Sequence, residues 1–260
     1  MKVDFPEHKY PNLRFFLGDI RDKERLERAF NGVDVVIHAA ALKQMDTAEY
    51  NPDEFIKTNV LGSQNIVECA IKTNVKKVIA LSTDKACSPS TLYGATKLCA
   101  EKIFLAANNI KGDKETVFLA ARYGNVYGSR GSLIPLLEKL NRNNNKTFTL
   151  TNKEATRFFI TYNDAIKLVF DAINNFDFGL VLVPKLKSIK IIELVKTLYP
   201  NIKIKIGTLR PGEKISEKLI SSNENIVYDL GKYFGIIPIH ITVSKNFKKN
   251  NKFIVWKIFL

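Results

Sequence analysis

The stretch VKKVIALSTDKACSPSTLYGATK, residues 75–97, decides the fold of this chain. Its first eight residues, Val75 to Ser82, form an apolar run typical of a buried strand, and a helix is expected from about Leu92 to Asn108. The same alternation surrounds this stretch, with expected strands at 13–17, 33–40 and 116–122 and expected helices at 23–30 and 52–72. Alternation of this kind predicts an α/β fold, with a mostly parallel sheet wrapped by helices.

The pattern changes after Ser132, where shorter helices and weaker strands at 179–184 and 203–207 indicate a smaller second lobe. We therefore expect a first domain over residues 1–130, a lobe over 131–220 and a basic tail over 221–260. The chain ends in the apolar run FIVWKIFL, residues 253–260. Eight residues cannot span a bilayer, so we interpret this run as a terminal strand or a disordered end.

The chain is strongly basic, with 40 lysines and arginines against 26 acidic residues and a net charge of +14. Such a field attracts polyanions, which raises nucleic acid as a partner. However, the lysines are spread through every segment, and the only dense cluster lies at 245–252. We therefore interpret the charge as a compositional bias and rank a nucleic-acid role last, because a phosphorylated small molecule fits the same charge.

Membrane and secretory classes are not favoured. No apolar run approaches the ~20 residues of a membrane helix, so stable membrane insertion is not expected. The first eight residues, MKVDFPEH, lack the apolar core of a secretory signal. The three cysteines have neither a metal-ligand spacing nor an even number for disulfides, so no metal site is expected. These features predict a reducing, cytoplasmic setting.

The strongest local chemical signal is the pair Tyr93 and Lys97, which a helix places on one face. A phenol with an ordinary pKa near ~10 is a poor base at neutral pH, and a nearby ammonium lowers that pKa. Such a pair can accept a proton from an alcohol while a hydride leaves its carbon. Because this spacing also occurs by chance in many helices, the pair needs support from its surroundings.

That support comes from Thr83-Asp84-Lys85, at the end of the strand expected over 75–82. Ligands of open parallel sheets bind beyond the carboxyl ends of the strands. A neighbouring acid and amine can divide proton donation from proton abstraction, because each shifts the titration of the other. The alternative is a surface ion pair, but together with Tyr93 and Lys97 the catalytic interpretation is favoured.

With these residues in place, the chain resembles the extended short-chain dehydrogenase/reductase family. Within that family it is most similar to the inverting UDP-N-acetylglucosamine 4,6-dehydratases of polysaccharide biosynthesis. The matching stretches run in family order and are HAAALKQ (38–44), AEYNP (48–52), KTNVLG (57–62), LSTDKA (81–86), LYGATK (92–97), RYGNVYGSRG (122–131), TRF (156–158) and RPGEK (210–214).

The resemblance implies a lyase reaction with NADP as a catalytic cofactor and a UDP-sugar as substrate. Tyr93, supported by Lys97, is expected to accept the C4 hydroxyl proton, with Thr83 hydrogen-bonded to the C4 oxygen. Lys85 is then expected to remove the C5 proton while Asp84 protonates the leaving C6 hydroxyl. The product is a C5-inverted 4-keto-6-deoxy sugar, which in this family opens the pseudaminic acid pathway used to glycosylate flagellin.

The resemblance also assigns the binding residues. For the cofactor it implies Asp19 and Ile20 beside adenine and Ala39, Ala40 and Ala41 beneath the nicotinamide ribose, together with Tyr93 and Lys97. For the substrate it implies Lys43, Asn125, Arg157, Arg210 and Glu213, of which the arginines suit a diphosphate because a guanidinium binds one through two parallel hydrogen bonds. Relatives assemble as homo-oligomers, so the intact family member is expected to do so.

The sequence departs from the family at both ends. Its thirteen glycines include no Gly-x-x-Gly-x-x-Gly turn before the first expected strand. The predicted fold is therefore a Rossmann-like, doubly wound sheet that lacks its first βαβ unit, which spans ~30 residues or more, with a smaller C-terminal substrate lobe. An N-terminally truncated chain of this kind should expose apolar surface near Leu13, and its own activity is in question. A nucleotide-sugar 4-epimerase and a non-catalytic interaction protein stay open as alternatives.

Overall fold

The computed structural model describes residues 5–6, 8–142, 147–224 and 226–254. Its centre is a seven-stranded sheet, with the order β1-β2-β3-β7-β11-β10-β12. The first four neighbours, β1 (Val35–His38), β2 (Lys77–Thr83), β3 (Val117–Tyr123) and β7 (Val181–Pro184), are parallel. The last three, β11 (Tyr233–Ile236), β10 (Val227–Asp229) and β12 (Lys252–Ile254), continue the sheet antiparallel. The expected α/β class with a mostly parallel sheet is confirmed.

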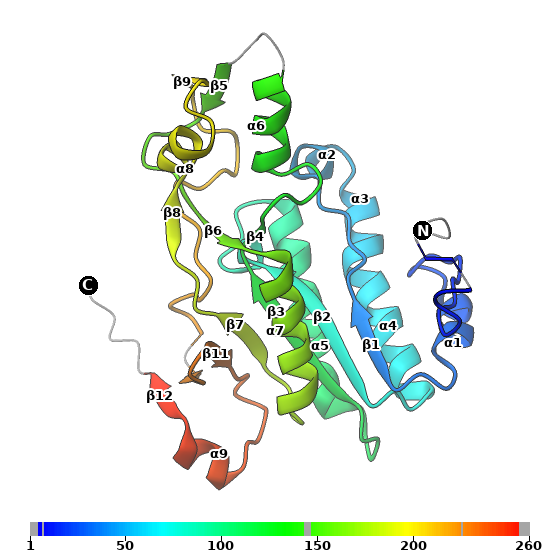
Figure 1. Ribbon diagram of the computed structural model, residues 1–260. Helices are drawn as coiled ribbons and strands as arrows, with labels where there is room; N and C mark the ends of the chain where they lie inside the picture. Colours follow the sequence, from blue (N-terminus) through cyan, green and yellow to red (C-terminus); the bar gives the residue numbers. More distant parts are fainter. Residues whose placement is uncertain (1–4, 7, 143–146, 225, 255–260) are drawn as a thin grey trace.

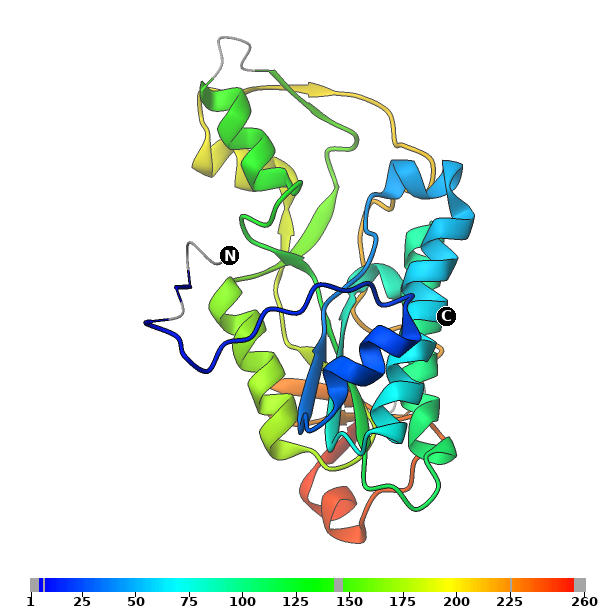
Figure 2. The ribbon, with the colours of Figure 1, turned by 90° about the vertical axis from the view of Figure 1, so that its right-hand side faces the viewer.

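Helices cover both faces of the central parallel strands, and Figure 2 shows the sheet between them. One face carries α1 (Lys23–Phe30), α4 (Gly62–Lys72) and α5 (Leu92–Ile110), packed on a core that includes Ile66, Phe104 and Phe118. The other face carries α7 (Tyr162–Asn175), whose Leu168 and Ala172 pack on Ile79 and Leu119. This is the doubly wound arrangement, because parallel strands expose apolar residues on both faces and both must be covered.

Several element boundaries follow local sequence signals. The helix expected at 23–30 is α1, and the side chain of Asp22 caps it by accepting a hydrogen bond from the Arg25 amide. The helix expected from Leu92 is α5, capped by Thr91, whose hydroxyl accepts from the Gly94 amide. The stretch expected to be helical over 52–72 is α3 (Pro52–Phe55), a π-helical segment (Ile56–Leu61) and α4.

The strand expected at 13–17 was wrong. This segment joins no strand ladder in the described structure, since β1 pairs only with β2. Backbone groups of an extended segment need a neighbouring strand, and this segment has none beside it. Its side chains are exposed, Phe16 at 61% and Leu17 at 93%, and so are Val35 and Ile37 of β1. The expected exposure of apolar surface near Leu13 is therefore observed.

A smaller lobe lies above the carboxyl ends of the parallel strands (Figure 1). It contains α6 (Leu133–Arg142), α8 (Ile191–Leu198) and the parallel pair β5 (Thr147–Leu150) and β9 (Lys203–Ile206). A three-stranded sheet, β4 (Asn125–Val126), β6 (Thr156–Ile160) and β8 (Ser188–Lys190), connects it to the main sheet region. The lobe has its own core, in which Leu137, Phe148 and Val195 are buried together.

The chain crosses between the two regions more than once. β7 lies within the range expected for the lobe, yet it pairs with β3 in the main sheet. Residues beyond 220, expected as a separate basic tail, contribute β10, β11, α9 (Lys245–Asn250) and β12 to the same region. Residues 255–260, most of the expected apolar end, lie outside the described residues. Within the described residues, no helix combines the length and apolar character needed to cross a membrane.

Candidate active site

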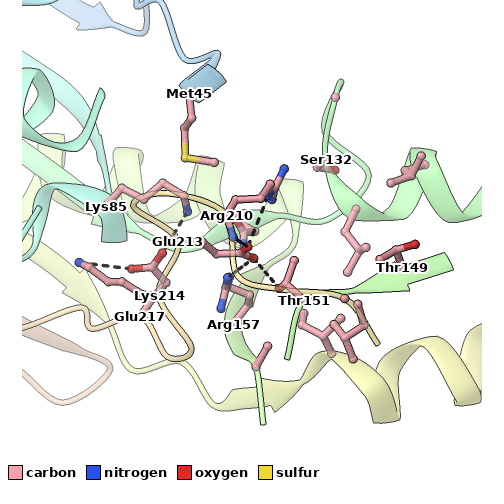
Figure 3. Close-up of a pocket in the computed structure, with 18 of the residues that line it drawn as sticks. Met45, Lys85, Ser132, Thr149, Thr151, Arg157, Arg210, Glu213, Lys214 and Glu217 are labelled. Atoms are coloured by element: carbon pink, nitrogen blue, oxygen red, sulfur yellow. Dashed lines mark hydrogen bonds and ion pairs between the residues drawn. The ribbon is translucent and has the colours of Figure 1, made fainter. Parts of the chain in front are cut away.

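A cavity of about 910 Å³ lies where the main sheet meets the lobe (Figure 3). The main sheet side contributes Lys85, Ser90 and Thr91, which follow β2, and the lobe contributes residues of α6, β5 and β6. Four of the residues expected to bind the substrate line it: Asn125, Arg157, Arg210 and Glu213. The cavity thus lies beyond the carboxyl ends of the parallel strands, where open α/β sheets bind their ligands.

The Thr83-Asp84-Lys85 triplet forms a compact polar group at the end of β2. Asp84 is fully buried, and its Oδ1 accepts hydrogen bonds from the Thr83 hydroxyl at 2.9 Å and from the Lys85 ammonium at 3.0 Å. The other carboxylate oxygen, Asp84 Oδ2, is buried and has no hydrogen-bond partner in the described structure. An acid and an amine therefore lie in direct contact, with one acid oxygen left free for a further partner.

A close approach of α5 brings Tyr93 and Lys97 to this group. A Cβ atom on Gly94 would lie 2.4 Å from the carbonyl oxygen of Lys85, so only a glycine permits this packing. Burial and, secondly, the negative charge of Asp84 raise the pKa of Tyr93 to about 12, although hydrogen bonding to Thr83 opposes the shift. The phenol is thus close enough to Thr83 and Asp84 for both to affect its pKa.

Lys97 is buried and lies one turn after Tyr93 on α5. Its ammonium donates to the carbonyl oxygen of Leu81 at 2.8 Å, and burial lowers its pKa to about 8. Desolvation and, secondly, the charge of Lys97 together lower the pKa of buried His38 to about 3. We expected Lys97 to lower the pKa of Tyr93, but burial dominates that phenol and Lys97 is not among the groups that shift it.

Two arginines and Glu213 form a second polar group in the cavity (Figure 3). Glu213 pairs with Arg157 at 3.3 Å and with Arg210 at 3.4 Å, and it accepts a hydrogen bond from Thr151 at 3.0 Å. Burial raises the pKa of Glu213, but hydrogen bonds from the Arg210 amide and Thr151 outweigh it, so the net pKa is lowered. The carboxylate therefore stays charged and holds both guanidinium groups at the cavity wall.

The remaining expected residues lie at different distances from this centre. The segment directly after β1 contains Ala39, Ala40 and Ala41. The next residue, Leu42, is linked to Thr96 of α5 by the buried side chain of Asn59, which forms hydrogen bonds of 2.8–3.1 Å with both. Lys43 donates to the carbonyl of Arg130 at 3.0 Å and does not line the cavity.

Asp19 and Ile20 lie outside the cavity. Asp19 is bound by Arg21, whose hydrogen bonds lower the pKa of its carboxyl, and Ile20 packs close to Gly62 of α4. The structure thus brings together the residues after β2, those of α5 and those of the lobe, and leaves Lys43, Asp19 and Ile20 apart from them.

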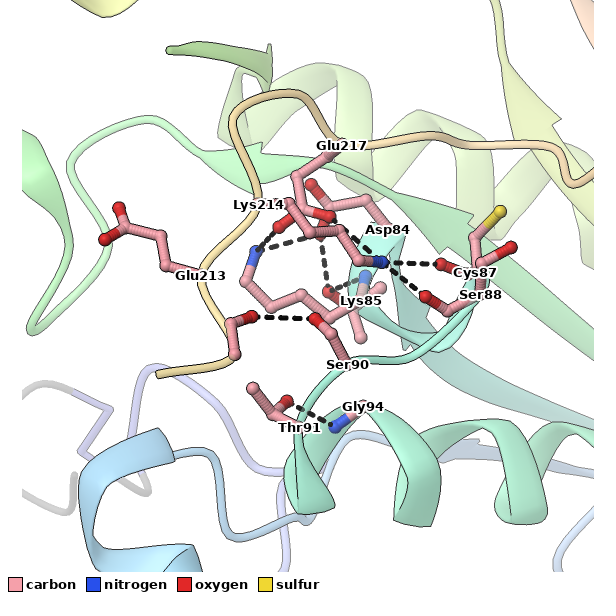
Figure 4. Close-up of polar contacts among 12 residues, drawn as sticks. Asp84, Lys85, Cys87, Ser88, Ser90, Thr91, Gly94, Glu213, Lys214 and Glu217 are labelled. Atoms are coloured by element: carbon pink, nitrogen blue, oxygen red, sulfur yellow. Dashed lines mark hydrogen bonds and ion pairs between the residues drawn. The ribbon is translucent and has the colours of Figure 1, made fainter. Parts of the chain in front are cut away.

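Two further residues were missed by the sequence reasoning: Lys214 and Glu217 both line the cavity. Lys214 donates to the carbonyl oxygens of Cys87, at 3.1 Å, and Ser88 (Figure 4). Glu217 is 6% exposed and lies near the ammonium groups of both Lys85 and Lys214. The RPGEK stretch contains Lys214 and ends three residues before Glu217, so proximity to that stretch was the only signal available.

The parallel sheet covered on both faces, the cavity at its carboxyl ends and the Tyr-x-x-x-Lys pair define a Rossmann-fold protein of the short-chain dehydrogenase/reductase class. More specifically, a family model described as "Polysaccharide biosynthesis protein" matches residues 2–237, and the chain belongs to this family.

Individual relatives are consistent with this assignment. The UDP-N-acetylglucosamine 4,6-dehydratase (inverting) of Campylobacter jejuni subsp. jejuni serotype O:2 is 48% identical over 237 residues, 91% of this chain and 71% of the relative. A UDP-glucose 4-epimerase of Rickettsia felis is 42% identical over 233 residues, 87% of this chain and 67% of the relative. Among solved structures, Pen from Bacillus thuringiensis superposes with a TM-score of 0.86 at 38% identity and covers 92% of this chain and 75% of its own.

Proposed function

We propose that this chain carries the dehydration site of a nucleotide-sugar 4,6-dehydratase that acts on UDP-N-acetylglucosamine and inverts C5. One observation carries the proposal: buried Asp84 is in direct contact with Lys85, which lines a cavity large enough for a sugar nucleotide, and Tyr93 is close enough for Asp84 to shift its pKa. Oxidation alone needs only the phenol and its neighbours. A second acid–base pair is needed when water is also eliminated.

In the first step, Tyr93 accepts the C4 hydroxyl proton, and Thr83 hydrogen-bonds the C4 oxygen. The charge of Asp84 is one reason why the pKa of Tyr93 is raised. If Asp84 holds a proton, as its role as an acid requires, that contribution disappears and the phenol becomes a better base. The two roles are therefore compatible.

In the second step, the new C4 ketone acidifies C5. Lys85 removes the C5 proton while Asp84 protonates the departing C6 hydroxyl as water. The free oxygen Asp84 Oδ2 is available for this donation because Oδ1 is already bound by Thr83 and Lys85. The 3.0 Å contact then allows Lys85 to return its proton to Asp84 and reset the pair. As the hydride returns to C6, C5 regains a proton from the opposite face, and the proton that Tyr93 accepted from the C4 hydroxyl balances it.

The cofactor proposed is a nicotinamide dinucleotide, specifically NADP, which when bound accepts a hydride from C4 and returns it at C6. Three features support the nicotinamide half: the alanines 39–41 directly follow β1, Tyr93 and Lys97 lie on α5, and Lys97 binds the Leu81 carbonyl of the neighbouring strand β2. Lys97 would hold the ribose there, because an ammonium has three donor hydrogens and its hydrogen bond to the Leu81 carbonyl uses only one. Asp19 and Ile20 are proposed to lie along the adenine half. No glycine triplet for the pyrophosphate occurs in the sequence.

For the substrate, we propose that Arg157 and Arg210 bind the diphosphate, with Glu213 holding them in place, and that Asn125 and Lys43 contact the sugar side. We further propose the division of labour expected from the sequence, with the region up to about residue 130 holding cofactor and residues 131–220 holding substrate. The proposed setting is cytoplasmic, as a homo-oligomer in surface-glycan biosynthesis, with pseudaminic acid and flagellin as the pathway and acceptor.

A nucleotide-sugar 4-epimerase is the second candidate, favoured by the 42% identity to the Rickettsia felis epimerase. Epimerisation uses the same Tyr93 and Lys97 chemistry but requires no acid–base pair for loss of water. Asp84 and Lys85 therefore favour dehydration.

The deciding experiment incubates the purified chain with NADP and UDP-N-acetylglucosamine and follows the sugar nucleotide by mass spectrometry and NMR. Loss of one water supports the dehydratase, whereas an unchanged mass with C4 inverted supports the epimerase. Tyr93→Phe should lower the rate by roughly 100-fold or more, whereas Tyr50→Phe, at an exposed tyrosine, should leave it unchanged. A folded chain that releases neither product would refute both functions for this chain.

A further inference from the structure

Glu217 is a buried carboxylate with no role in the chemistry described so far. It lies seven residues after Arg210, on the segment that crosses the cavity between the lobe and the main sheet (Figure 4). Its side chain is 6% exposed, and its Oε2 has no hydrogen-bond partner in the described structure. A buried charge without hydrogen bonds is costly, so its position calls for a reason.

The nearest cations explain where Glu217 lies. Lys85 Nζ is 3.9 Å from its Oε1 and Lys214 Nζ is 3.7 Å from its Oε2. Both distances are beyond hydrogen-bond range, whereas Lys85 is 3.0 Å from Asp84. Lys85 therefore lies between two carboxylates and is held closely by only one of them.

Lys214 fixes this arrangement from the other side. Its ammonium is bound to the carbonyls of Cys87 and Ser88, in the loop that leads from Lys85 to α5. The same loop is tied to the RPGEK turn by Ser90, whose hydroxyl donates to the Gly212 carbonyl at 2.7 Å. Lys214 is thus a cation held in place beside Glu217, and it balances part of the charge of that carboxylate.

We propose that Glu217 is a positioning residue for the elimination step: it orients the Lys85 amine toward C5 and stabilises the ammonium that forms there. The inference rests on the proposed dehydratase function. It assigns to Glu217 an effect on C5 deprotonation, and none on C4 oxidation or on nucleotide binding.

The charge balance of the step shows why a second carboxylate helps. The proposed step requires Lys85 to start neutral and Asp84 to start protonated, which leaves Glu217 and Lys214 as the charged pair beside them. The C5–H bond then breaks and its proton passes to Lys85 Nζ. Its electron pair forms the C5–C6 double bond as the C6–O bond breaks, and the leaving oxygen takes the proton of Asp84.

Two new charges appear together in a closed site, on Lys85 and on Asp84. The Glu217 carboxylate already lies 3.9 Å from the nitrogen on which the ammonium forms, so its attraction needs no reorganisation when the charge forms. The carboxylate therefore lowers the barrier to proton transfer without touching the substrate's reacting atoms.

A variant can separate this role from a structural one. Glu217→Gln keeps the size of the side chain and removes the charge, and no hydrogen bond to Glu217 is lost because the described structure shows none. Thermal unfolding should consequently change little. Glu217→Asp keeps the charge at a longer distance, and Glu193→Gln makes the same chemical change at an exposed position of α8.

The test measures steady-state kinetics with UDP-N-acetylglucosamine and with its C5-deuterated form, and follows reduced nicotinamide by absorbance. We expect Glu217→Gln to lower kcat by about 10- to 100-fold with KM unchanged, to accumulate reduced nicotinamide, and to show a larger C5 isotope effect than the wild type. Glu217→Asp should recover part of the rate, and Glu193→Gln should behave as the wild type.

Wild-type kcat in Glu217→Gln would overturn the inference. So would a loss in which C4 oxidation slows as much as dehydration, because that pattern indicates a general disturbance of the site. If the wild-type chain itself neither oxidises nor dehydrates the sugar, the proposed function fails, which is a result distinct from either of these.

Discussion

Arg122 offers the sharpest test of what holds the site together. It is 1% exposed in β3 and binds two carboxylates from distant parts of the chain. Its guanidinium contacts Glu101 of α5 at 2.6 and 2.9 Å and Glu224 at 2.7 and 3.0 Å, and it donates to the Leu219 carbonyl at 2.9 Å. These contacts join α5, which carries Tyr93, to the segment that follows Glu217.

Arg122→Met should therefore be strongly destabilising. The substitution leaves Glu101, 2% exposed, with its charge unpaired, and breaking a buried ion pair from one side costs about 3–5 kcal/mol. Glu224 is 13% exposed, so water can reach its unpaired charge and its loss of a partner adds less to the destabilisation. Both carboxylates hold the pKa of Arg122 well above its usual value, against a desolvation effect that opposes the charge.

Urea unfolding followed by far-UV circular dichroism at neutral pH measures the change, with linear extrapolation to water. Arg28→Met, at an exposed arginine of α1, is the matched control and should lie within about 0.5 kcal/mol of the wild type. Adding Glu101→Gln to Arg122→Met should recover stability, because it removes the unpaired charge. If the single variant does not fold, Arg122→Lys keeps the charge, loses the paired geometry and should cost about 1–3 kcal/mol.

A free energy of unfolding for Arg122→Met within about 1 kcal/mol of the wild-type value would refute this prediction, because a broken buried ion pair is expected to cost about 3–5 kcal/mol. A double variant less stable than the single one would also refute it. In either case the Glu101–Arg122–Glu224 network would not be what fixes α5 against the segment at 219–224.

Three further predictions follow from single positions. Lys97→Met should raise the free energy of unfolding by about 1–3 kcal/mol at pH 7, because burial lowers the pKa of Lys97 to about 8 and the buried charge opposes folding. Urea titrations should show this gain disappear as the pH rises from about 8 to 10.5, where the lysine of the unfolded chain also becomes neutral. Gly94→Ala should lower the free energy of unfolding by about 1–3 kcal/mol and slow catalysis, because the added Cβ would lie 2.4 Å from the Lys85 carbonyl oxygen. Thermal unfolding and rate measurements test this, with Cys99→Ala at an exposed position of the same helix as the control. Ile37→Thr should change stability by no more than about 0.5 kcal/mol in the same unfolding assay, because this side chain of β1 is 48% exposed; a larger loss would mean that the face of β1 is covered in solution.

Local patterns were reliable where the physics is local. Helices α1 and α5 begin at Lys23 and Leu92, where the sequence predicted them, and the side chains of Asp22 and Thr91 cap their starts. The buried strands at 77–83 and 117–123 followed from apolar runs, because strands covered on both faces need apolar residues at every position. The strand expected at 13–17 failed for the opposite reason: an apolar run becomes a strand only if another strand lies beside it, and that is not a local property.

The candidate site divides in the same way. The sequence by itself determined which residues could do proton chemistry, since Tyr93 and Lys97 lie one helix turn apart and Asp84 and Lys85 are neighbours in the chain. Only the tertiary structure decided that Glu213 holds two arginines, that Asn59 ties the end of β1 to α5, and that Glu217 lies beside Lys85. The contacts of Glu213 with Arg157, of Asn59 with Thr96 and of Glu217 with Lys85 join residues 37 to 132 positions apart, whereas Arg210 and Glu213 are only three positions apart. The geometry of the long-range contacts is set by tertiary packing, including that of the lobe against the sheet. No spacing in the sequence encodes that packing, because it depends on the summed contacts of both regions.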